Sequence, residues 1–149
     1  MRRRRGTGRA GRLRRVPAAH EFHVKTTKKI ERIDITKQVE RAAGDLGVAS
    51  GALLVSVPHT TAAVTVGETW DPEVATDVER ALAAWVPEVR FEHGEGNSPA
   101  HFLSEAIGAS CLVPLEDSRP ALGRWQGIVL VELDGPRRRT VRVRALAGA

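Results

Sequence analysis

The sequence has little that would hold the chain together covalently or place it in a membrane. It contains one cysteine, Cys111, so no disulfide can form within the chain, as is usual in a reducing compartment. No apolar run approaches the roughly 20 residues that span a bilayer, and no apolar segment follows the basic N-terminus as it would in a signal peptide. We therefore expect a cytoplasmic protein without a membrane span, in which Cys111 is buried and inert.

Acidic residues are absent from the first 20 positions, which carry eight arginines. The rest of the chain is mildly acidic, so the tail contributes +8 and residues 21–149 contribute −3 to the formal net charge of +5. An Arg/Gly-rich segment without hydrophobic periodicity buries too little surface to offset its ordering entropy. We predict a disordered tail over residues 1–20 and one domain over residues 21–149. Because the body has no basic stripe, nucleic acid binding is expected only through the tail.

Hydrophobic periodicity predicts strands and helices interspersed along the body of the chain. Helices are expected after three start signals: Thr36, Asp71 followed by proline, and Ser98 followed by proline. Gly47 and Gly108 are placed to end the first and third of these helices. Alternating or β-branched runs predict strands at 22–26, 33–35, 53–57, 62–66, 110–115, 127–133 and 139–145. Without βαβ units or internal repeats, this order predicts an α+β fold, a mainly antiparallel sheet or sandwich with two to three helices.

Two of the tryptophans are expected to take part in packing. Trp85 shares a helical face with Val74, Val78 and Leu82, so we expect it to point toward the core. Trp125 begins a predicted strand, where tryptophan is more often a core or interface anchor than a platform for a ligand.

Three of the five histidines fall in polar breaks next to regular elements. His59 follows a predicted strand, His93 lies in a glycine-containing loop, and His101 lies in the first turn of a predicted helix. Three converging imidazoles suit a catalytic zinc site with an open fourth position. They equally suit an anion pocket or proton transfer, and their spacing is not a standard zinc spacing. A structural hydrogen-bonding role is the alternative for each, and we assign no role to His20 and His23.

The HGEGN loop has features of a ligand-binding loop. Gly94 and Gly96 allow close approach of the backbone to a ligand, and the free N–H groups at the start of the Ser98 helix favour an anion. Glu95 is a candidate general base or Mg²⁺ ligand. The alternative is a glycine-rich turn in which Asn97 tolerates left-handed geometry.

Four motifs occur in one order: VPHTTAAVTV, a helix begun by Asp71 and Pro72, HGEGNSPAH, and LGRWQGIVLVELDGPRRRTVRV. Together, over nearly the whole domain, they resemble the YjbQ family, also called UPF0047. The resemblance implies a homotrimer whose subunits share or border a pocket of polar motif residues. The residues implicated in this way are His59, Thr60, Thr61, His93, Glu95, Asn97, His101, Trp125, Gln126 and the turn from Asp134 to Arg137, in which Arg137 is a candidate phosphate ligand.

The resemblance also implies an activity, that of a secondary thiamine-phosphate synthase. Such an enzyme joins hydroxymethylpyrimidine diphosphate to a thiazole phosphate and releases pyrophosphate; Mg²⁺ would stabilise the leaving group while a histidine manages protons. Two alternatives stay open: a metal-dependent hydrolase or lyase that uses Zn²⁺ or Mg²⁺ on the three histidines with Glu95 as base, and a non-catalytic trimeric module for a phosphorylated metabolite. Arg124 departs from the family, which commonly has threonine there, so substrate preference would differ if this position faces the pocket.

Overall fold

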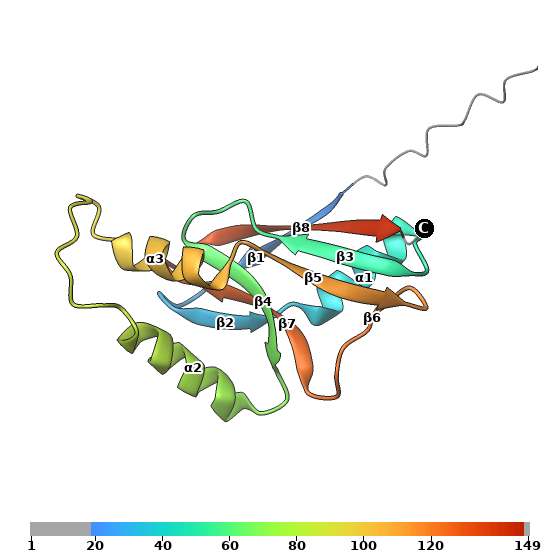
Figure 1. Ribbon diagram of the computed structural model, residues 1–149, viewed down its shortest axis with the longest axis horizontal. Coiled ribbons are helices and arrows are strands. Elements are labelled where there is room, and N and C mark those ends of the chain that lie inside the picture. Colours follow the sequence, from blue (N-terminus) through green and yellow to red (C-terminus); the bar gives the residue numbers. More distant parts are fainter. Residues whose placement is uncertain (1–18, 148–149) are drawn as a thin grey trace, which may run out of the picture.

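The computed structural model describes residues 19–147, so all but the last two positions of the predicted tail lie outside the described residues. In this part of the chain, eight strands form two sheets and three helices pack on them (Figure 1). All strand pairings are antiparallel, in the orders β1-β8-β3-β5-β6 and β2-β7-β4. The predicted α+β architecture is confirmed. The strands are β1 His20–Lys25, β2 Glu31–Asp34, β3 Gly51–Ser56, β4 Ala62–Glu68, β5 Ser110–Glu116, β6 Arg119–Pro120, β7 Gln126–Glu132 and β8 Arg138–Ala147; the helices are α1 Thr36–Leu46, α2 Pro72–Ala84 and α3 Ser98–Ile107.

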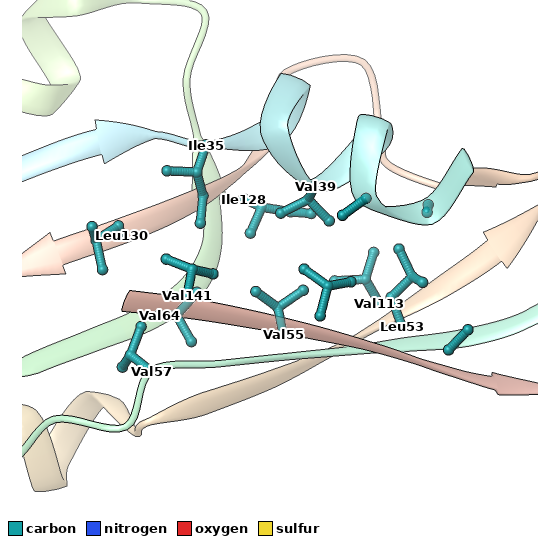
Figure 2. Packing of buried hydrophobic residues seen from close by; sticks show 14 of the residues in the cluster. Ile35, Val39, Leu53, Val55, Val57, Val64, Val113, Ile128, Leu130 and Val141 are labelled. Carbon is teal, nitrogen blue, oxygen red and sulfur yellow. The ribbon is translucent and has the colours of Figure 1, made fainter. Parts of the chain in front are cut away.

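The main core lies between the five-stranded sheet and a layer formed by α1 and the three-stranded sheet (Figure 2). Val55 and Val141 enter it from the first sheet, Val39 from α1 and Ile128 from β7. A smaller cluster on the other face of the three-stranded sheet includes Leu103 of α3. Because β7 is buried on both faces, its sequence is a continuous apolar run instead of an alternating one.

Helix α1 ends as predicted but begins differently. Gly47 adopts the left-handed conformation at its C-terminus, with φ of +64°. The prediction that Thr36 caps the helix is wrong, because Thr36 is the first helical residue and the capping position belongs to Ile35, which makes no side-chain bond there. The Thr36 hydroxyl instead accepts a hydrogen bond from the backbone N–H of Ile128 at 2.8 Å and donates to Asp34. It therefore joins α1 to β7.

Helix α2 begins as predicted, because the Asp71 carboxylate accepts a hydrogen bond from the backbone N–H of Glu73 at 2.8 Å. The inward orientation expected of Trp85 is wrong. The helix ends at Ala84, and the Trp85 side chain is 56% exposed. It contacts Phe102 of α3 edge-on, with 6.0 Å between ring centroids, instead of packing on a sheet.

The fold bears on two expectations, the absence of a membrane span and the state of Cys111. No helix between residues 19 and 147 is long and apolar enough to cross a membrane. Cys111 in β5 is partly buried and forms no disulfide. Burial raises the pKa of its thiol to about 11, so the thiol stays protonated at neutral pH, as expected of an inert cysteine.

Gly44 lies inside α1, where an added Cβ would meet no atom within 4 Å. Glycine in a helix interior costs about 1 kcal/mol relative to alanine. We therefore expect Gly44→Ala to raise the free energy of unfolding by about 0.5–1 kcal/mol, measured by urea denaturation. Gly47→Ala is the matched control and should destabilise, because its positive φ does not suit alanine. A Gly44→Ala protein no more stable than wild type would contradict this reading of the helix.

Candidate functional site

A buried ion pair joins the ends of β7 and β8. Glu132 and Arg139 are 0% and 4% exposed, and Arg139 Nε donates to the Glu132 carboxylate at 2.8 Å. The same guanidinium donates to the hydroxyl and carbonyl oxygens of Thr61, at 2.8 and 3.0 Å. The Thr26 hydroxyl completes the group by donating to Glu132 at 2.9 Å. Since buried charges are tolerated only when paired and hydrogen-bonded, this cluster fixes three distant segments against one another.

The Glu132 carboxylate is ionised at neutral pH. Burial raises its pKa, but hydrogen bonds from Arg139, the backbone N–H of Asp134 and the Thr26 hydroxyl lower the pKa by more, so the net shift is downward. Sequence reasoning missed this residue. Its only signal is an acidic side chain at the end of the apolar run IVLVE, where a buried strand would otherwise continue.

The turn between β7 and β8 passes very close to the segment that follows β1. A Cβ added at Gly135 would collide with the carbonyl oxygen of Lys28 and lie 2.7 Å from the Glu132 side chain. The Gly135 backbone N–H donates to the carbonyl oxygen of Lys29 at 3.0 Å. Glycine is required here because the turn must approach this closely for the Arg137 backbone N–H and carbonyl to bond to Thr26, at 2.7 and 2.8 Å.

We expect Gly135→Ala to lower the free energy of unfolding by about 3 kcal/mol, because the methyl group can be accommodated only if backbone moves away from the buried pair. The measurement is chemical denaturation. Gly94→Ala is the control, since a Cβ at that loop position meets nothing within 4 Å. Equal stability of the two variants would show that the turn adapts without cost.

A polar cleft of about 590 Å³ opens above the buried pair. Three parts of the chain line it: the β3–β4 connection, the loop and first turn of α3, and the turn into β8. The structure therefore brings together seven of the ten predicted site residues. The full lining is Val57, Pro58, His59, Thr60, Thr61, Glu95, Asn97, His101, Asp134, Arg137 and Arg139.

His59 has a defined hydrogen-bonding form. Its Nε2 accepts a hydrogen bond from the backbone N–H of Thr140 at 2.8 Å, so a neutral ring carries its proton on Nδ1. Burial lowers the pKa of His59, and the nearby positive charge of Arg139 lowers it further. The imidazole is therefore neutral at pH 7 and offers one donor, Nδ1–H. Thr140, which sets this form, was not among the predicted site residues.

Arg137 is held in place by the residues around it. Its Nε and Nη2 donate to the Asp134 carbonyl and carboxylate oxygens, at 2.8 and 2.7 Å. Asn97 Nδ2 donates to the same carboxylate at 3.2 Å. Burial raises the pKa of Asp134, but the bonds from Arg137 and Asn97 lower it by more, so this carboxylate stays charged. About half of the Arg137 side chain remains exposed, which leaves the guanidinium accessible to a ligand.

The three histidines predicted as metal ligands do not form one group in this chain. The rings of His93 and His101 lie edge to face, 5.8 Å apart, and His93 Nε2 lies 3.7 Å from Glu95. Between residues 19 and 147, no three His, Cys, Asp or Glu side chains are arranged to share a metal ion. A neutral His59 binding a metal through Nδ1 would carry its proton on Nε2, where it would oppose the Thr140 N–H. The donor set therefore does not fit a three-histidine metal site within one chain.

Trp125 and Gln126 lie away from this cleft in the same chain. Gln126 begins β7 and Glu132 ends it, which separates them by roughly 20 Å at about 3.4 Å per residue. The Gln126 side chain accepts a hydrogen bond from the backbone N–H of Gly123 at 2.8 Å and so closes its own turn. Trp125 is 59% exposed, so it is not a core residue. Arg124 is exposed at the same end of the strand.

The fold and the site place this protein among α+β domains built of two antiparallel sheets, with a polar cleft at one end of β7. The family model "UPF0047 protein YjbQ-like" matches residues 20–148. This chain belongs to that family. It is 44% identical over 128 residues to the UPF0047 protein YugU of Bacillus subtilis, covering 84% of this chain and 96% of YugU. It is 40% identical over 127 residues to a UPF0047 protein of Methanocaldococcus jannaschii, covering 85% and 92%.

Solved structures of relatives have the same fold. A YjbQ/UPF0047 family protein from Clostridium acetobutylicum matches with a TM-score of 0.81 and 40% identity, covering 85% of this chain and 99% of that one. A hypothetical protein from Aeropyrum pernix K1 matches with a TM-score of 0.81 and 36% identity, covering 88% and 99%. The fold described above is therefore the fold of the family.

Proposed function

We propose that the cleft beside His59 binds a phosphorylated metabolite and that the protein is a transferase of the thiamine-phosphate synthase type. The convergence of hydrogen-bond donors at one place is the observation that supports this. His59 offers Nδ1–H, Arg137 offers a half-exposed guanidinium fixed by Asp134, and Thr60 offers an exposed hydroxyl. Donors of these kinds are suited to phosphoryl oxygens.

The proposed reaction needs charge stabilisation more than proton transfer. The ring nitrogen of the thiazole phosphate attacks the methylene carbon of hydroxymethylpyrimidine diphosphate. A C–N bond forms, the C–O bond to the diphosphate breaks, and pyrophosphate leaves with the electron pair. Negative charge gathers on the departing oxygen, where fixed donors such as His59 Nδ1–H and Arg137 lower the barrier.

The test is incubation of the purified protein with both substrates, followed by fluorescence detection of thiamine phosphate after its oxidation. We expect product to accumulate linearly with time and protein, and none with heat-denatured protein or with either substrate left out. If the protein makes no product but still binds the diphosphate substrate, it is a non-catalytic binding module and not a transferase. Absence of both product and binding would overturn the proposal.

A metal-dependent hydrolase or lyase is the second candidate function. His93 lies 3.7 Å from Glu95 and edge-on to His101, but the described residues of one chain hold no group of three metal ligands, so this candidate requires a second copy to complete the site. Elemental analysis of untagged protein, purified without chelator, discriminates this candidate from the first. About one metal ion per chain, absent from a His93→Ala variant, would favour the hydrolase. A metal content unaffected by that substitution would count against it.

The homotrimer and the cytoplasmic location are further parts of the proposal. Trp125 and Gln126 lie far from the cleft in their own chain. In a trimer, these residues of one copy would border the cleft of another. Light scattering on the purified protein should give about three times the chain mass of 16.2 kDa. A mass of 16.2 kDa at all concentrations would show that the protein is a monomer, and a pocket shared between subunits could then not exist.

A further inference from the structure

A second cleft, of about 570 Å³, shares Arg137 with the polar cleft. Its walls come from the end of β1 and from the turn into β8. Because Arg137 lines both clefts, the two lie next to each other. The lining residues are His23, Lys25, Thr26, Pro136, Arg137 and Arg138. None of them is acidic, and three of them carry a permanent positive charge.

The strand register places two of these charges directly against each other. Lys25 on β1 pairs with Arg138 on β8, and both side chains are exposed on the same face. Like charges directly opposite in an antiparallel pair are destabilising. Among residues 19–147, neither side chain has a carboxylate within 4.0 Å, and residues 1–18 contain no Asp or Glu that could supply one. The repulsion is therefore not offset within the chain, and an anionic ligand would offset it.

The polar cleft has a different charge balance. Two carboxylates, Glu95 and Asp134, line it together with Arg137 and Arg139, and Arg139 is already neutralised by the buried Glu132. Arg137 is likewise paired with Asp134, so the charges left without a partner are Lys25 and Arg138 in the basic cleft, and these favour an anion there. The two hydrogen bonds from Arg137 to Asp134 use its Nε and Nη2 groups, and about half of the side chain stays exposed.

We propose that the basic cleft is the subsite that anchors the diphosphoryl group of the ligand, while the reacting part of the ligand occupies the polar cleft beside His59. This inference rests on the proposed function and adds a ligand class and a position to it. Lys25 and Arg138 supply two positive charges that no carboxylate within 4.0 Å offsets, and the half-exposed Arg137 guanidinium, paired with Asp134, adds N–H donors for phosphoryl oxygens. His23 also lines this cleft, and its Nδ1 lies 3.2 Å from the Thr140 hydroxyl.

The test is calorimetric titration of the full-length chain with inorganic pyrophosphate and with orthophosphate. We expect pyrophosphate to bind at least about tenfold more tightly than orthophosphate, because it engages more of the three cations. Lys25→Gln and Arg138→Gln should each weaken pyrophosphate binding about tenfold, and the double variant about 100-fold. Both side chains are exposed, so the variants should fold, which thermal unfolding verifies.

Lys37→Gln and Arg119→Gln are the matched controls, since these cations line a separate cleft that also contains Glu40. They should bind pyrophosphate within about twofold of wild type. The arginines of residues 1–20 are the same in every variant, so differences report on the cleft. Unchanged binding in the Lys25→Gln/Arg138→Gln double variant, or equal losses in the controls, would overturn the proposal. Displacement of pyrophosphate by a single-stranded oligonucleotide at lower concentration would also overturn it, in favour of a nucleic acid surface.

Two further results separate this inference from the proposed reaction. His59→Gln should keep pyrophosphate binding within about twofold while losing turnover, because His59 lines only the polar cleft. If wild type makes no thiamine phosphate but shows the expected binding pattern, the reaction is wrong and the diphosphate subsite stands. If turnover is present and unaffected by Lys25→Gln and Arg138→Gln, the subsite is wrong and the reaction stands.

Discussion

Replacing Arg139 with alanine is expected to lower the free energy of unfolding by about 3–5 kcal/mol, the largest stability loss anticipated in this protein. The substitution leaves Glu132, which is fully buried, without its counter-ion, and leaves the Thr61 carbonyl oxygen without its guanidinium donor. An uncompensated buried charge costs far more than the lost contact area of the side chain. Urea denaturation followed by circular dichroism measures the change.

Arg142→Ala is the control, because Arg142 lies on the same strand and also pairs with a glutamate. Its partner Glu21 is 2.9 Å away, but both side chains are nearly half exposed, so solvent screens the pair and the loss should be much smaller than for Arg139→Ala. Comparable losses of stability in Arg139→Ala and Arg142→Ala would mean that burial does not determine the cost of breaking the Glu132–Arg139 pair. A smaller loss in an Arg139→Ala/Glu132→Ala double variant than in Arg139→Ala would confirm that the unpaired carboxylate is the cause.

The Glu132–Arg139 ion pair also makes the free energy of unfolding depend on pH. The pKa of Glu132 is lower in the folded chain than its unfolded value of about 4.3. Its contribution is therefore present above the unfolded pKa and is lost as the pH falls through the lower folded pKa. Denaturation midpoints between pH 7 and pH 3 should fall more steeply for wild type than for a protein in which both Glu132 and Arg139 are replaced.

Replacing His59 with alanine is expected to reduce turnover in the proposed reaction by about 100-fold or more, the largest effect expected on activity. The change removes the Nδ1–H donor from the polar cleft and the Nε2 acceptor of the Thr140 N–H. Two conservative variants separate these losses: asparagine keeps a donor near the Nδ1 position, and glutamine keeps an acceptor near Nε2. We expect His59→Asn to retain more activity and His59→Gln more stability. The reverse ranking would give His59 a purely structural role.

The activity should respond to pH through the same imidazole. Burial, followed by the charge of Arg139, lowers the pKa of His59 below the usual value of about 6.5. The neutral form, and the stability it contributes, is therefore present above 6.5 and is lost as the pH falls through the folded pKa. A pH–rate profile should be flat from pH 8 to about 6.5 and decline only at lower pH. A decline in rate that begins above pH 7 would contradict a neutral His59 whose tautomer is fixed by the Thr140 N–H.

Local signals in the sequence predicted most of the elements. Asp71 followed by proline starts α2, and Gly47 ends α1, because caps and left-handed turns depend on a few neighbouring residues. The errors lie where tertiary contacts compete with local rules. Thr36 bonds to β7 instead of capping its own helix, and Trp85 lies beyond the end of its helix.

The candidate site was predicted in part, for the same reason. Polar breaks in the sequence marked His59, Asn97 and His101, which the fold brings into one cleft. No local pattern indicates that Glu132 pairs with an arginine, or that Lys25 stands opposite Arg138. Both facts depend on the pairing of strands far apart in the sequence.

The sequence by itself therefore determined the α+β class, the antiparallel strands, the end of α1, the start of α2 and the family, because these depend on periodicity, capping and motif order. Only the tertiary structure decided what each polar residue faces. It separated Trp125 from the His59 cleft by the length of β7, gave His59 its tautomer through Thr140, and collected Lys25, Arg137 and Arg138 around one cleft. Register and burial set these relations, and neither is encoded within a short stretch of chain.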